Sequence, residues 1–138
     1  MNTNKFLVGG IIGGVTNFFL GWLIYGMLLM NFMQSHSNNA SGVFRTEETM
    51  IWWALIIGNL AFGFLLSYIL NKSNVNSAMA GATVGAVVGF LMSLAIDFSI
   101  YAQINLWDTT AMAVDIIAST VMSAIAGAAI GWYLGRGK

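Results

Sequence analysis

Two aspartates of this chain lie within long apolar stretches, where an ionisable side chain is unusual. Asp97 belongs to the stretch 78–104 and Asp115 to the stretch 111–134. A charged side chain at mid-bilayer costs about 2.5–3.5 kcal/mol on insertion scales, which makes both acids functional candidates. Counted inward at about 1.5 Å per residue, Asp97 lies roughly 10 Å and Asp115 roughly 7 Å from the nearer end of its stretch.

Hydroxyl side chains accompany both acids. Residues four apart share a helix face, and each acid has a serine at that spacing, while a tyrosine of the first apolar stretch reaches a similar depth. The third and fourth stretches are joined by a short loop, so we expect them to pair. The predicted cluster, open toward the outer side of the membrane, consists of Tyr25, Ser93, Asp97, Tyr101, Asp115 and Ser119.

The chemistry of this cluster has two interpretations. Two nearby carboxyls in a medium of low dielectric repel each other as anions, which suits a proton relay or a cation site. No Lys, Arg or His lies within the apolar stretches, so a structural salt bridge is disfavoured. In the alternative, both acids are shallow enough to contact interfacial water or to cap neighbouring helices.

Two asparagines, Asn17 and Asn59, lie deeper in the first and second stretches. Asparagine between membrane helices usually donates a hydrogen bond to another helix, a contact that contributes about 0.6–2 kcal/mol. We therefore expect a structural role for this pair, with the lining of a solute path as the alternative.

Several classes of function are disfavoured by what the sequence lacks. Cysteine is absent and His36 is the one histidine, so no metal site or cofactor is expected. The Gly-x-Gly-Asp signature of intramembrane aspartyl proteases is missing before Asp97, and the five basic residues are scattered. We predict that the protein is not an enzyme and does not bind nucleic acid. The alternative is an enzyme that acts on lipid.

The elements that carry these residues are predicted to be four membrane-spanning helices. The chain is 58% hydrophobic and only 7% charged, whereas a soluble domain is about 25% charged. Spanning a bilayer takes roughly 20 apolar residues. The sequence predicts an all-α membrane protein, a single four-transmembrane-helix bundle with helices at about 6–33, 50–70, 78–104 and 111–134. Start signals are Thr46, Ser77 and Asp108.

The basic residues predict the orientation. Cytoplasmic loops are enriched in Lys and Arg, and four of the five basic residues flank one face. These are Lys5, Lys72, Arg136 and Lys138, against Arg45 on the other. We expect both termini on the cytoplasmic side (N-in, C-in) of a multi-pass protein of the cell inner membrane.

Glycines recur at four-residue spacing and predict close helix packing. Small residues on one face allow two helices to approach. The stripes are Gly9 with Gly13, Gly10 with Gly14, Gly81 with Gly85 and Gly89, and Ser123 with Gly127, Gly131 and Gly135. We expect a tight cytoplasmic half and a looser, more polar outer half. Three long stripes favour a homo-oligomer.

The first stretch resembles a known family. The run from Asn17 to Gly26 (NFFLGWLIYG), followed by Met33-Gln34 and a polar loop, is similar to the opening of the small bacterial membrane proteins grouped as DUF1761. The length, helix count and glycine-rich third helix are also similar, although Tyr25 lacks the adjacent tryptophan of that family. The resemblance implies a bacterial inner-membrane protein and assigns no functional residues.

Two hypotheses follow. In the first, a small non-enzymatic membrane protein binds or passes a proton, cation or small solute through its outer-facing polar cluster. In the second, it is an accessory or scaffold subunit that assembles with another membrane protein through its glycine-rich faces. The lipid bilayer is the partner in both.

Overall fold

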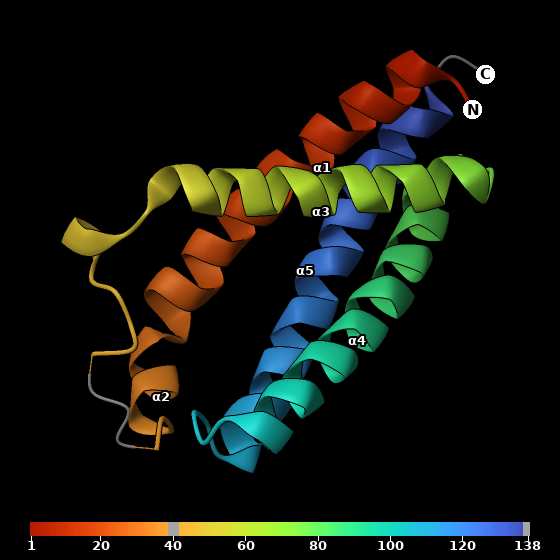
Figure 1. The fold of residues 1–138 in the computed structure, drawn as a ribbon. Helices are drawn as coiled ribbons and strands as arrows, with labels where there is room; N and C mark the ends of the chain where they lie inside the picture. The colour runs from red at the N-terminus through yellow and green to blue at the C-terminus, as the bar shows by residue number, and fades with distance from the viewer. Residues whose placement is uncertain (39–41, 137–138) are drawn as a thin grey trace.

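The computed structural model describes residues 1–38 and 42–136, and these fold into helices without a named strand (Figure 1). Four apolar helices are long enough to cross a membrane. The four spans are formed by α1 (Thr3–Leu23) with the π-helix η1 (Ile24–Leu28), by α3 (Trp52–Lys72), by α4 (Ala78–Gln103) and by α5 (Thr109–Gly135). The chain is thus an all-helical, multi-pass membrane protein, as predicted.

The first helix differs from its prediction as one α-helix over 6–33. After Leu23 the helix widens into η1, where the Leu29 amide donates to the Ile24 carbonyl at 2.7 Å, and Leu29 separates this turn from α2 (Met30–Ser35). Gly21 and Gly26 lie in or next to the widened segment, and glycine supports α-helical geometry poorly. The widened turn carries Tyr25.

The start signal at Thr46 was assigned to the wrong element. Thr46 and Thr49 form a capping box around the short 3-10 helix η2 (Glu47–Thr49), after which Met50 is extended and α3 begins at Trp52. The other two caps are confirmed. Ser77 Oγ accepts from the Ala80 amide at 3.2 Å, and Asp108 Oδ1 accepts from the Ala111 amide at 2.8 Å.

The helices form two antiparallel pairs that contact each other mainly through α5, which packs against α1 and, over fewer residues, against α3. α4 packs along α5, α1 packs against α3, and α1 also contacts α5, whereas α3 and α4 touch only slightly. Figure 1 shows α3 crossing α1 and its first half leaving the bundle. Both termini lie at one end, which we call the terminal end, and α2 and the α4–α5 turn lie at the other, the loop end.

The glycine stripes pack within the chain. A Cβ added at Gly81 or Gly85 would meet a backbone carbonyl of α5, and one at Gly14 would meet the backbone of Leu60 in α3. The buried core lies beside these contacts and consists of Leu66, Leu70, Ala126, Ile130 and Leu134. Helices of the same chain occupy these stripes, so the stripes give no support for a homo-oligomer. The homo-oligomer stays a prediction.

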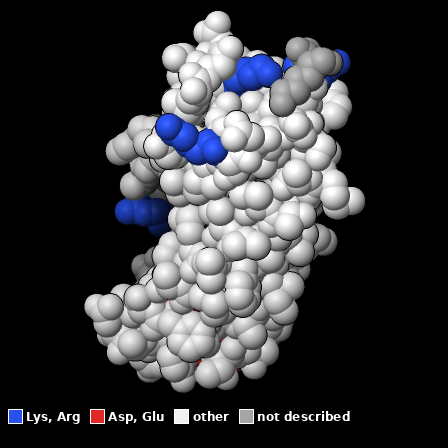
Figure 2. Space-filling view, turned by 90° about the vertical axis from the view of Figure 1, so that its right-hand side faces the viewer, with Lys and Arg blue, Asp and Glu red and all other residues white. Residues whose placement is uncertain are grey.

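The basic side chains gather toward the terminal end. In the face shown in Figure 2, Lys and Arg are absent from the lower part, which is almost entirely uncharged. Lys5 at the start of α1 donates through Nζ to the Leu134 carbonyl at 3.2 Å, and Arg136 lies over the Trp132 ring. Lys138, the fourth residue of the predicted basic side, lies outside the described residues.

Replacing Gly85 by alanine should destabilise the bundle, because the new Cβ would press on the Ser123 carbonyl. We expect the free energy of unfolding in mixed micelles to fall by about 1–3 kcal/mol. The control is Gly58→Ala, where no atom lies within 4 Å of the added Cβ; its unfolding free energy should stay level or rise by up to about 1 kcal/mol. Equal losses in the two variants would contradict this packing.

Cysteine labelling tests the predicted orientation. The chain has no cysteine of its own, so a single introduced cysteine is the one site that a maleimide can label. Val43 lies in the loop between α2 and η2 and Ser73 follows α3, and both are exposed. A membrane-impermeant maleimide should label Val43→Cys on intact cells and should label Ser73→Cys only after lysis. The reverse pattern would place the termini outside.

Candidate functional site

The strongest polar contact within the bundle joins Tyr25 of η1 to α5. Its hydroxyl donates to Asp115 Oδ1 at 2.6 Å and lies 3.2 Å from Ser119 Oγ. Tyr25 lies four residues after Gly21, whose own face meets Met122 of α5. α1 thus already contacts α5 one turn before the tyrosine bridges them. The structure thus brings together three of the predicted site residues.

Asp97 faces this group from α4. It is only 4% exposed, and its carboxyl lies close enough to that of Asp115 for the two to interact electrostatically. Within the described part of the chain, Asp97 Oδ2 is buried without a hydrogen-bond partner. Most buried polar atoms are paired, so an unpaired carboxylate oxygen needs a specific explanation. A proton or a cationic partner would supply one.

Ser93 and Tyr101, one turn from Asp97 on either side, have different surroundings. Ser93 is buried, and its hydroxyl donates to the Gly89 carbonyl at 2.8 Å. Tyr101 is 49% exposed, and among the described residues no hydrogen bond links it to the cluster. The four-residue spacing identified a shared helix face for Tyr101, but Tyr101 lies near the end of α4 and its exposed side chain does not join the cluster.

Asn17 and Asn59 form the hydrogen bond between helices that their depth predicts. Asn17 Nδ2 donates to Asn59 Oδ1 at 2.8 Å, and Asn59 Nδ2 donates to the Leu55 carbonyl at 2.8 Å. This bond joins α1 to α3, whereas Tyr25, eight residues further along the same row, contacts α5. Asn17 also lines a cavity, so its structural and lining roles coexist.

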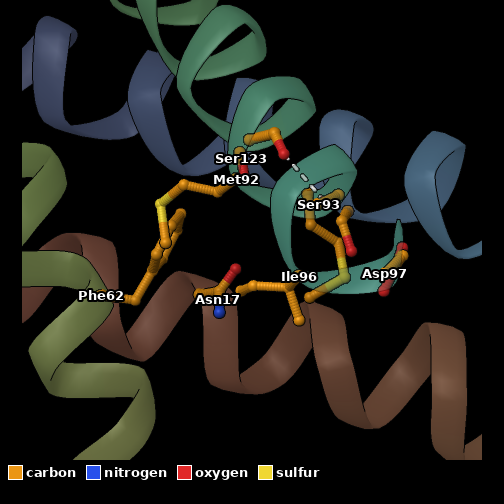
Figure 3. Close-up of a pocket in the computed structure, with 10 residues that line it drawn as sticks. Asn17, Phe62, Met92, Ser93, Ile96, Asp97 and Ser123 are labelled. Atoms are coloured by element: carbon orange, nitrogen blue, oxygen red, sulfur yellow. Dashed lines mark hydrogen bonds between the residues drawn. The ribbon is translucent and has the colours of Figure 1, made fainter. Parts of the chain in front are cut away.

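The cavity lies between the two helix pairs and has a volume of about 200 Å³ (Figure 3). Asp97, Ser93 and Ser119 contribute polar atoms, and all four long helices contribute residues. Ile96 lines the cavity and is also 51% exposed, so the cavity reaches the bilayer-facing surface beside it. The apolar wall and one serine were not among the predicted site residues: Phe62, Met92, Ile96, Met122 and Ser123.

A sequence signal existed for one of these residues. Ser123 follows Ser119 by one helical turn and continues its face, but it was assigned to the glycine stripe. The apolar residues had no such signal, because a methionine or isoleucine in a membrane helix faces lipid as readily as a cavity.

The loop end is held closed above the cluster by main-chain contacts. The Asn38 amide donates to the Leu106 carbonyl at 3.0 Å, and the Asp108 amide donates to the His36 carbonyl at 3.2 Å. These bonds tie the segment after α2 to the α4–α5 turn. His36 stacks on Phe32 and bonds its carbonyl through Nδ1, so its ring packs locally rather than toward the acids.

Chemically, the cluster is a group of side chains that can exchange protons, beside a cavity. The carboxyls of Asp97 and Asp115, the Tyr25 phenol and the Ser119 hydroxyl can each accept or pass a proton. The described residues contain no group of three or more acids and histidines that could hold a metal ion.

No protein-family model, curated protein or solved structure matches this chain. The resemblance to DUF1761 proteins therefore stays a prediction, and the function is inferred from the geometry of the site.

Replacing Tyr25 by phenylalanine removes the hydroxyl that bridges Asp115 and Ser119 while keeping the ring. We expect the free energy of unfolding to fall by about 1.5–3 kcal/mol, the contribution of a hydrogen bond to a charged group. The matched control is Tyr101→Phe, whose exposed hydroxyl should matter by less than about 0.5 kcal/mol. Equal effects in an unfolding titration would show that the bridge contributes nothing.

Proposed function

We propose that this chain is a small, non-enzymatic membrane protein that binds or passes a proton, a cation or a small cationic solute through the cluster around Asp97 and Asp115. The observation that carries the proposal is Asp97 itself, 4% exposed inside a membrane span with an unpaired carboxylate oxygen. Acids at such positions are costly and usually serve a solute or proton pathway.

The surroundings of the two acids support a positively charged occupant. The basic residues of the spans are Lys5 and Lys72, both near the terminal end, so the chain places no cation beside the carboxyls to balance them. Two acids that face each other also repel as anions. A proton or a cation bound between or beside them would remove this repulsion, whereas an anionic solute would increase it.

A structural role for Asp97 is less well supported. An acid that stabilised the fold would be expected to accept hydrogen bonds from a neighbouring helix, as Asp115 does from Tyr25. Asp97 Oδ2 accepts none from the described residues, and its contact with the Asp115 carboxyl becomes a hydrogen bond only when the two acids share a proton. A residue that lowers stability in return for activity is typical of functional sites.

The accessory-subunit hypothesis loses its main support, because the glycine faces that would bind another protein are occupied within the chain. Through the resemblance to DUF1761 proteins, the proposal extends to the inner membrane of a bacterium, with the polar cluster toward the outer side.

Replacing Asp97 by asparagine tests the proposal, since the side chain keeps its size and loses its charge. The variant should unfold at the same or a higher temperature than the parent protein, because an unpaired buried acid is removed. It should lose cation-dependent thermal stabilisation and any proton release measured in weakly buffered detergent solution.

The matched control is Glu48→Gln, which removes the same charge from an exposed position outside the spans. It should behave like the parent protein in both measurements. A stable Asp97→Asn protein with unchanged cation and proton responses would overturn the proposed function, and a strongly destabilised one would assign Asp97 a structural role.

A further inference from the structure

The polar atoms that line the cavity are mainly hydrogen-bond acceptors. Ser93 lines it with an oxygen whose hydrogen is already donated to the Gly89 carbonyl. Asp97, when ionised, can only accept, and its Oδ2 has no partner among the described residues. The hydroxyls of Ser119 and Ser123, which also line the cavity, can donate or accept, so a ligand must bring donors for Asp97 and Ser93 in particular.

The orientation of Asn17 follows from a chain of bonds in α3. Asn59 Nδ2 donates to the Leu55 carbonyl, which leaves Asn59 Oδ1 as the acceptor for Asn17 Nδ2. The Asn17 oxygen is therefore turned away from Asn59, and Figure 3 shows it pointing toward the cavity. The amide thus adds a third acceptor to the lining.

The acceptors are separated by apolar side chains. In Figure 3, Asp97 lies at one end of the cavity, Asn17 and Phe62 lie at the other, and Ile96 lies between them. A bare Ca²⁺ or Mg²⁺ ion needs about six or more oxygen ligands arranged around one point, and this lining does not converge in that way. An elongated ligand with one cationic end fits it better.

The size and mouth of the cavity narrow the class of ligand. A dry cavity of about 150 Å³ in another protein holds benzene, so about 200 Å³ holds a slightly larger molecule. The cavity reaches the surface beside Ile96, on the flank that faces the bilayer. An amphiphilic molecule dissolved in the membrane could therefore enter sideways, without passing the closed loop end.

We infer that the cavity binds a compact organic ammonium ion with an apolar body. The ammonium group donates to Asp97 and Ser93, and the body lies against Met92, Ile96, Met122 and Phe62. The inference rests on the proposed function, because it names the kind of cation that the acidic cluster receives. The ring of Phe62 adds an apolar face at the far end.

The test compares three probes by thermal unfolding of the purified full chain in detergent. These are benzylamine, which is protonated at neutral pH, the neutral isostere benzyl alcohol, and sodium chloride at matched ionic strength. Benzylamine should raise the midpoint of unfolding in a saturable way, and the other two should not. Its apparent affinity should weaken by about tenfold or more in Asp97→Asn and stay unchanged in Glu48→Gln.

The possible results separate the inference from the proposed function. If benzyl alcohol stabilises as well as benzylamine, the cavity is merely apolar and the inference is wrong. If sodium or acidification alone stabilises the protein, in an Asp97-dependent way, the inference is wrong and the proposed function stands. If none of the three probes and no change of pH acts through Asp97, both are wrong.

Discussion

The close approach of α4 and α5 is the contact on which the rest of the site depends. Gly81 meets Gly127, Gly85 meets Ser123, and Gly89 meets Ser119, so each turn along α4 is matched by one turn back along α5. One further turn in the same register brings Ser93 level with Asp115, and the next brings Asp97 level with Ala111, which lies one turn from Asp115 on the same face of α5. Without side chains between the backbones, helices can pack closely enough for this register to be fixed. The facing of the two acids is thus a consequence of glycines at the other end of the same interface.

The cavity exists because the remaining helices do not complete the packing that α4 and α5 begin. α1 gives one face to α3 and another to α5, and α3 barely touches α4. The space left between the pairs is bordered by Asn17 and Phe62 on one side and by Asp97 on the other. Filling it with apolar side chains would add dispersion energy and stabilise the fold. The buried acid and the open volume therefore lower the stability of the fold, and packing alone does not explain why both are present.

The sequence predicted the spans, two of the three caps and the group of Tyr25, Asp115 and Ser119, because these follow from composition and from local spacing along one helix. It did not predict the π-helical turn, since hydrophobic periodicity does not register one extra residue in a turn. Tyr101 was misjudged because a shared helix face does not reveal which neighbour that face meets. The partners of the glycine stripes and the apolar wall of the cavity depend on how helices cross, which a single sequence does not specify.

One row of α1 explains how a tight bundle becomes a polar site within a single interface. Gly9 and Gly13 pack against Ile130, Asn17 borders the cavity, Gly21 meets Met122, and Tyr25 reaches Asp115. These residues are spaced by four, the ridge that usually packs into the groove of a neighbouring helix. The side chains of this row are small near the terminal end, and polar ones appear toward the loop end. The helix widens at the last residue of the row, Tyr25, where it contacts α5. Beyond that turn, α2 no longer follows the row and leads to the segment whose Asn38 amide donates to the Leu106 carbonyl. The row of α1 that contacts the acids therefore also leads to the segment that closes the loop end.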